Sequence, residues 1–177
     1  GLTMALVVEA GAGLANAESY VSVADCAAYA TSRGLTFATS PEAAAEAALR
    51  RATAFIDSYR GRFPGMRYRR REQALEWPRS EAWDARNDQY VPYNAVPVEI
   101  VQATCEAAVR ELASPGSLAP DLTPGVRMKR VKAGTVEVET EYAGGGLTAA
   151  KSYSVIEGIL SGLLGARSFF TGTAVRG

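Results

Sequence analysis

Apolar positions recur with the period of an α-helix in four stretches of this chain. Ser22 and Asp25 have the spacing of a capping box, so a helix is expected to start there and to end at Gly34. Ser40-Pro41 predicts the start of a second helix, with Ser at the cap and Pro in the first turn. The positions expected to be buried on these two helices are Val23, Cys26, Ala27, Ala30, Ala45, Ala48, Leu49, Ala52, Ile56 and Tyr59.

Two further helices are predicted in the second half of the chain. One starts at Pro97 and runs to about Ala113, and the other is the short, very apolar stretch Tyr153–Leu164. Gly158 and Gly162 lie four residues apart on the last helix, which favours close packing against a partner or the core. The expected buried positions are Val101, Thr104, Cys105, Ala108, Leu112, Ile156, Ile159, Leu160, Leu163 and Leu164.

The remaining segments have no helical period. Residues 61–95 are rich in Gly, Pro, Asn and aromatic residues, and so long an irregular region is typical of a functional loop or an interface. Residues 126–142 predict a β-hairpin that turns at Ala133-Gly134, with one basic arm and one acidic arm. This hairpin either protrudes and pairs with a neighbouring chain or lies on the surface with internal ion pairs. Its charged residues are Arg127, Lys129, Arg130, Lys132, Glu137, Glu139 and Glu141.

These patterns predict a mainly α fold. We expect a small bundle of about four helices with a protruding β-hairpin, a long irregular loop and an extended C-terminal tail. Residues 4–165 form the single expected domain, and residues 166–177 form the tail.

Composition narrows the possible functions. The 19 basic and 19 acidic residues cancel, so no global field directs the chain to nucleic acid or to a membrane. The absence of histidine removes Ser-His-Asp and Cys-His catalysis and histidine metal sites, and no other motif indicates an enzyme, a metal or a cofactor. Cys26 and Cys105 are expected to be small buried residues. No stretch approaches the roughly 20 apolar residues of a membrane span.

Six arginines gather within twelve residues, together with Phe63 and Tyr68. Basic residues interleaved with aromatic ones suit a nucleic-acid backbone with stacked bases, and they equally suit an acidic protein groove. The alternative is a solvated loop that follows a helix C-terminus, where cations are favourable. The six are Arg60, Arg62, Arg67, Arg69, Arg70 and Arg71.

Two other stretches carry weaker signals. The turn GAGLAN at 11–16 has half of a dinucleotide-binding fingerprint but lacks its third glycine. Glu81, Asp84 and Asp88 lack the order of a calcium loop, so we expect them in a solvated loop.

Several stretches resemble one phage protein family across nearly the whole chain. They are GLANAESYVSVADCAAYATSRG at 13–34, QALEWPR at 73–79, VPVEIVQATCEAAVRELA at 96–113, the hairpin VRMKRVKAGTVEVETEY at 126–142 and the closing VRG. Members of this family are labelled DnaT-like single-stranded-DNA-binding proteins, and their helical layout is similar to that of the head-to-tail adaptor proteins of long-tailed phages.

The resemblance implies a structural protein of the virion neck, assembled in the cytoplasm of the host bacterium. Such adaptors form a ring, typically of twelve copies, beneath the portal, and they join the portal to the next neck or tail-completion protein. Genomic DNA passes through the ring without sequence-specific contacts. The hairpin and residues 61–95 would then contact neighbouring subunits, and Arg67 to Arg71 would face either DNA or an acidic neighbour. The expected portal-docking residues of the tail are Phe169, Phe170, Val175 and Arg176. The alternative is a single-stranded-DNA-binding protein, as the family label says.

Overall fold

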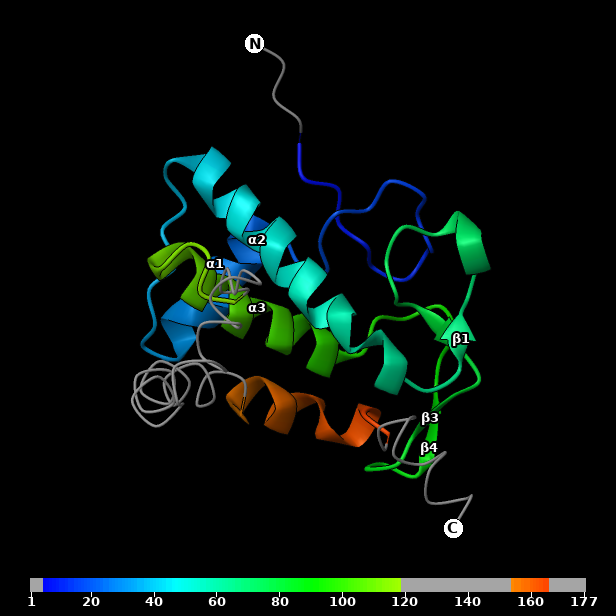
Figure 1. Ribbon diagram of the computed structural model, residues 1–177. Coiled ribbons are helices and arrows are strands. Elements are labelled where there is room, and N and C mark those ends of the chain that lie inside the picture. Colours follow the sequence, from blue (N-terminus) through cyan, green and yellow to red (C-terminus); the bar gives the residue numbers. More distant parts are fainter. Residues whose placement is uncertain (1–4, 119–153, 166–177) are drawn as a thin grey trace, which may run out of the picture.

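A computed structural model describes residues 5–118 and 154–165, and it confirms a small, mainly α fold. Two strongly amphipathic helices and two shorter ones carry the core (Figure 1). They are α1 (Val23–Ser32), α2 (Glu42–Asp57), α3 (Val98–Ala113) and a helical segment at 154–160, which continues into the 3₁₀ helix η3 (Ser161–Leu163). None of the helices in these ranges has both the length and the hydrophobicity of a membrane-spanning segment.

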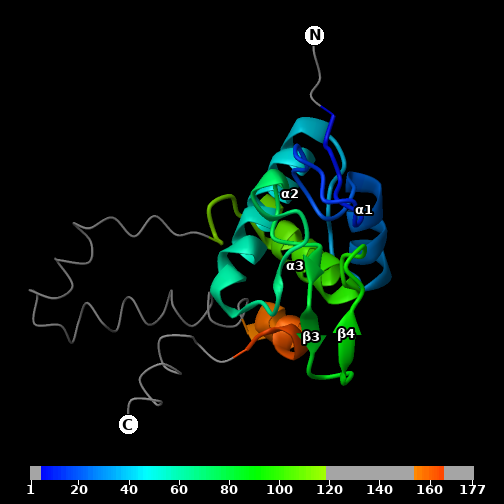
Figure 2. The ribbon, with the colours of Figure 1, turned by 90° about the vertical axis from the view of Figure 1, so that its right-hand side faces the viewer.

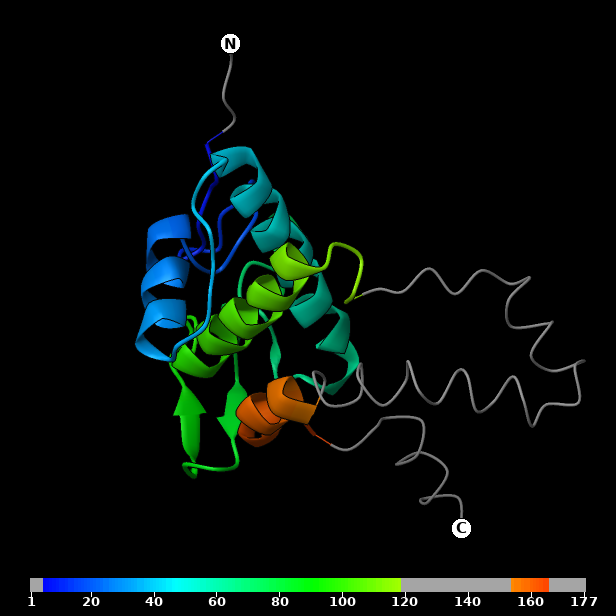
Figure 3. The ribbon, with the colours of Figure 1, turned by 90° about the vertical axis from the view of Figure 1, so that its left-hand side faces the viewer.

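Helices α2 and α3 pack on each other through small side chains at the centre of the fold. Ala45 and Ala52 on α2 and Ala103 and Ala107 on α3 are fully buried, which lets the two helices approach closely. Helix α1 packs on α3 from one side, as Figure 3 shows. The segment 154–160, orange in Figure 1, closes the core from below α3. Its buried side chains, with those of η3, are Ile156, Leu160 and Leu163.

The predicted helix starts are confirmed at α1 and shifted at α2. The Ser22 hydroxyl accepts a hydrogen bond of 3.1 Å from the backbone N–H of Asp25, and Gly34 follows α1 with a φ of 71°. At α2 the extended backbone of Pro41 occupies the N-cap position, and no side chain caps the helix. Ser40 therefore lies one residue outside the cap position that was predicted for it.

The prediction that residues 61–95 are irregular is wrong in part. After the 3₁₀ helix η1 (Ser58–Arg62), the chain forms two antiparallel ribbons, β1 with β2 and β3 with β4. Figure 2 shows β3 and β4 side by side. The strands are β1 (Met66–Arg67), β2 (Arg79–Ser80), β3 (Ala82–Asp84) and β4 (Gln89–Val91), and the 3₁₀ helix η2 (Arg70–Glu72) lies between β1 and β2. Strands of two or three residues are too short for an alternating pattern to emerge from the sequence.

Three predicted features lie outside the described residues. They are the hairpin at 126–142, the start of the last helix at Tyr153 and the C-terminal tail at 166–177.

The two glycines of the last helix have different surroundings. A Cβ on Gly162 would lie 2.6 Å from the Cβ of Arg86, and the carbonyl of Gly162 accepts a hydrogen bond of 3.2 Å from the N–H of Ala85. A Cβ on Gly158 would meet no atom within 4 Å. Of the two, Gly162 alone has the close packing that was predicted, and it joins η3 to the turn between β3 and β4.

We expect Gly162→Ala to destabilise the fold by about 1–3 kcal/mol, because its methyl group must displace the first side-chain carbon of Arg86. Gly158→Ala is the matched control on the same helical segment. It should be neutral or stabilise the helix by about 0.5–1 kcal/mol, since alanine restricts the unfolded chain and meets open space. Urea unfolding followed by circular dichroism measures both changes. Equal midpoints for the two variants would contradict the close approach.

Candidate functional site

A buried hydrogen-bond network joins two segments that are far apart in the sequence. The Tyr20 hydroxyl donates to the Asp57 carboxylate at the end of α2 and accepts a hydrogen bond of 3.1 Å from the N–H of Trp77. The second carboxylate oxygen of Asp57 accepts from the N–H of Glu76 at 3.2 Å. Tyr20 is 3% exposed and Asp57 is 6% exposed. The stretch before α1 and the QALEWPR stretch therefore meet at the end of α2.

Burial sets the protonation of this network. Burial raises the pKa of Asp57 to about 6, against the hydrogen bonds from Tyr20 and from the Glu76 N–H that lower it. Burial and the neighbouring Asp57 raise the pKa of Tyr20 well above its usual value, so the phenol keeps its proton and stays a donor. Asp57 was not predicted as part of a site, because in the sequence it looks like an ordinary polar residue near a helix end.

The side chains of QALEWPR are held by the chain itself. The amide of Gln73 is 1% exposed, donates to the carbonyls of Leu75 and Pro78 at 2.8 and 2.9 Å, and accepts from the N–H of Arg69 at 2.8 Å. Trp77 is fully buried and packs edge-to-face on Phe63, with ring centroids 5.4 Å apart.

Arg79 ends this stretch and is also buried. Its guanidinium donates to the carbonyls of Pro64, Gly65 and Glu76 at 2.6, 3.0 and 3.1 Å. It also pairs with the Glu76 carboxylate at 2.9 Å. Burial lowers the pKa of Arg79, and the Glu76 carboxylate opposes that shift. All of these contacts fasten the β1–β2 ribbon to the core, so the stretch has a structural role.

The six arginines of the predicted cluster are mostly bound by their own chain. Arg60 and Arg67 point to the Glu76 carboxylate at 3.3 and 3.9 Å, and Arg69 pairs with Glu72 at 3.1 Å. Arg70, in the left-handed region with a φ of 54°, donates to the carbonyls of Arg67 and Tyr68 at 2.7 and 3.1 Å.

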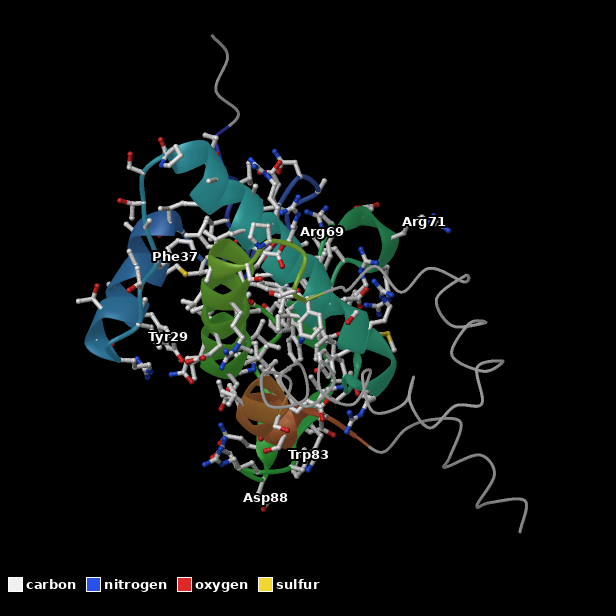
Figure 4. The ribbon with its side chains drawn as sticks, turned by 60° about the vertical axis from the view of Figure 1, so that its left-hand side comes forward. Tyr29, Phe37, Arg69, Arg71, Trp83 and Asp88 are labelled. Carbon is white, nitrogen blue, oxygen red and sulfur yellow. The ribbon has the colours of Figure 1, made fainter. Side chains whose placement is uncertain are left out.

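The other two arginines differ from each other. Arg62 donates to the Gly165 carbonyl at 3.1 Å, and the N–H of Gly165 donates back to the Arg62 carbonyl at 2.8 Å. Arg71 makes no hydrogen bond or ion pair within the described ranges, and its side chain extends away from the body beyond Arg69 (Figure 4). The structure therefore breaks the predicted cluster into five anchored cations and one that is available.

The turn with half of a dinucleotide fingerprint is occupied by its own carboxylate. Glu9 is fully buried and accepts hydrogen bonds from the N–H groups of Gly11, Gly13 and Leu14 at 2.8, 2.8 and 2.7 Å. These are the donors that a phosphate would need. The turn therefore offers no phosphate site, and this role of Glu9 was not predicted from the sequence.

The expectation of a solvated loop is wrong for Asp84 and right for its neighbours. Asp84 is 7% exposed and accepts from the N–H groups of Arg86 and Asn87 and from the Asn87 side chain, at 3.0, 3.2 and 2.7 Å. Burial alone would raise the pKa of Asp84, but these hydrogen bonds lower it below its usual value. Glu81 and Asp88 are exposed. The described residues contain no group of three or more side chains that could hold a metal ion.

Two aromatic pairs in the region 61–95 are exposed, and of their four residues only Tyr68 was named from the sequence as a candidate. Trp83 and Tyr90 are 42% and 60% exposed, and Tyr68 and Tyr93 are 37% and 52% exposed. The ring centroids lie 4.9 Å apart in each pair. Large exposed aromatic side chains are typical of surfaces that bind another molecule.

Comparison with known proteins adds one finding. A family model described as "Putative DnaT-like ssDNA binding protein" matches residues 4–177. No curated protein and no solved structure matches the chain.

We expect Tyr20→Phe to destabilise the fold by about 2–4 kcal/mol, because it leaves one buried carboxylate oxygen and one buried N–H without their partner. The matched control is Tyr90→Phe, which removes an exposed hydroxyl and should change stability by less than about 0.5 kcal/mol. Guanidinium unfolding measures both variants. A Tyr20→Phe midpoint equal to that of the unmodified chain would contradict the role of the network.

The raised pKa of Asp57 predicts a pH dependence of stability. The folded chain holds this proton more tightly than the unfolded chain, since the pKa is about 6 rather than 3.8. Asp57 therefore adds its full contribution, about 3 kcal/mol, to the free energy of unfolding at pH values below its pKa in the unfolded chain. This contribution is lost as the pH rises through the pKa of Asp57 in the folded chain. Urea unfolding between about pH 4 and pH 7 should show this decline, and Asp57→Asn should flatten it. An unchanged slope in the variant would contradict the assignment.

Proposed function

The chain belongs to the family described as "Putative DnaT-like ssDNA binding protein", and we propose that it serves as a structural protein of the virion. In this role it is a head-to-tail adaptor that assembles as a ring beneath the portal and surrounds the path of the DNA. One observation carries the proposal. Five of the six clustered arginines are bound by their own chain, while two aromatic pairs remain exposed.

The state of the arginines favours a protein that surrounds DNA over one that binds it tightly. Affinity for single-stranded DNA comes largely from cations that neutralise phosphates. Here Glu76 and Glu72 already pair with three of the six arginines, and the whole chain carries no net charge. Weak, non-specific attraction suits a channel through which DNA must move.

The exposed aromatic pairs favour contact with other polypeptides. Aromatic side chains and Met are enriched at the centres of protein interfaces, and Met66, next to the Tyr68 pair in sequence, is 45% exposed. Exposed apolar side chains of this kind are typical of a surface that another protein covers.

The proposed partners are those that the sequence resemblance implies. They are further copies of the chain, in a ring of about twelve as in the adaptors it resembles, the portal, and the next neck or tail-completion protein. The hairpin that the sequence predicts at 126–142 and residues 166–177 would supply further contacts, the latter with the portal. The protein would assemble in the cytoplasm of the host bacterium and end in the virion neck.

A second function, binding of single-stranded DNA, is favoured by the edge of the body that carries Arg69 and Arg71 (Figure 4). Residues 57–79 hold seven arginines and three carboxylates, which leaves a local excess of four positive charges. Tyr68, 37% exposed, lies next to Arg69 in sequence and offers a ring for base stacking.

Electron microscopy and light scattering of the protein mixed with its cognate portal test the adaptor. We expect a ring of copies attached to the portal, and neither ring nor attachment would remove this function.

Binding to a fluorescent oligonucleotide across a salt series tests the second function in the same preparation. If DNA binding is the main function, Arg69→Ala with Arg71→Ala should reduce the slope of log affinity against log salt. The reduction should be about 0.7 for each phosphate that the variant no longer neutralises. The matched control is Arg33→Ala, which removes an exposed arginine that stacks on Tyr29. No binding at low salt would exclude the second function.

A further inference from the structure

The β3–β4 ribbon presents one aromatic pair on one face. Trp83 and Tyr90 are direct partners in the antiparallel register, and their rings meet edge-to-face. Ala82 and Val91, the next pair along the ribbon, are buried on its other face. The ribbon therefore fastens one face to the body and leaves the aromatic face to solvent.

This ribbon is ordered before it meets any partner. Asp84 accepts three hydrogen bonds across its turn, and the N–H of Ala85 donates to the carbonyl of Gly162. Gly162 also packs directly against Arg86. An aromatic pair on so constrained a turn loses little conformational freedom on binding, which is the condition for a strong interface contact.

The same chain carries an apolar groove between α1, α3 and the segment before α1. The groove has a volume of about 620 Å³. Val96, Val98, Val101 and Tyr29 contribute to its lining, and Val98 is 59% exposed. Figure 4 shows that the ribbon and the groove are different parts of the surface. Trp83 and Asp88 mark the end of the β3–β4 ribbon, and Tyr29 marks the α1 side of the groove.

Charge also permits two copies to meet through these surfaces. Arg86 at the turn of the ribbon is exposed, and its charge also helps to lower the pKa of Asp84 in the same turn. Asp25 at the groove is exposed and forms no ion pair within the described ranges. The 19 basic and 19 acidic residues leave no net repulsion between identical chains.

We propose that the Trp83–Tyr90 face of one subunit inserts into the α1–α3 groove of the next subunit. The two surfaces are unlike, so the contact is heterologous and repeats from copy to copy, and it closes into a ring when the rotation allows. This contact would join the subunits of the adaptor ring, and it therefore rests on that proposed function.

Cysteine cross-linking of the full chain tests which surfaces meet. Tyr90→Cys and Val98→Cys chains of different mass are mixed and oxidised with copper phenanthroline, and we expect a disulfide-linked heterodimer. The native Cys26 and Cys105 are free thiols, and both are replaced by Ala in every chain because Cys105 lines the groove. The matched control replaces Tyr90→Cys by Tyr93→Cys, since Tyr93 is 52% exposed but lies outside the ribbon. No heterodimer, equal yield in the control, or a dominant homodimer of Tyr90→Cys would each overturn the proposal.

Sedimentation equilibrium provides a second readout. Trp83→Ala with Tyr90→Ala should raise the dissociation constant for self-association by about tenfold or more, and Val98→Asp should do the same from the groove side. Circular dichroism establishes that each variant is folded. Association as strong as that of the unmodified chain would overturn the proposal.

The outcomes separate this contact from the proposed function. If both variants still form rings on the portal, the contact is wrong and the adaptor function stands. If the unmodified chain associates through the ribbon and the groove but never attaches to the portal, the contact stands and the function is wrong.

Discussion

The fold depends on the buried contact between the Tyr20 hydroxyl and the Asp57 carboxylate. Helix α2 ends at Asp57, the segment that leads into α1 passes Tyr20, and the stretch before β2 passes Trp77. Without this contact three chain segments would each leave a polar group in the core, and such groups are expensive to bury unpaired. The phenol and the carboxylate thereby fasten the stretch that leads into the β1–β2 ribbon to the end of α2.

The residues that carry the resemblance to the family are used mainly to build this arrangement. Gln73, Trp77 and Arg79 are buried within the fold, the side chains of Gln73 and Arg79 bind backbone carbonyls, and the hydroxyl of Ser22 caps α1. The family match therefore indicates a shared fold more directly than a shared binding surface. The surfaces that could contact other molecules, above all Trp83 and Tyr90, lie outside the stretch QALEWPR and follow it in the chain.

The helices could be predicted from the sequence because their apolar positions recur over several turns. Every position predicted to be buried on α2 from Ala45 to Ile56 is buried. The ribbons could not be predicted, because in β3 a single outward residue, Trp83, stands between two buried ones. The role of Glu9 was equally hidden, since a carboxylate finds three backbone N–H groups only after the glycine turn has taken its shape. The sequence shows that the arginines are close together in the chain. It does not show that the Glu76 carboxylate pairs with both Arg60 and Arg67 in the fold.

The reciprocal bonds between Arg62 and Gly165 have a mechanical consequence. Three backbone groups and one guanidinium form the two hydrogen bonds that hold the end of the last helical segment to η1, directly after α2. A tensile load applied to the chain at Gly165 would therefore reach η1 and the end of α2 through these two hydrogen bonds.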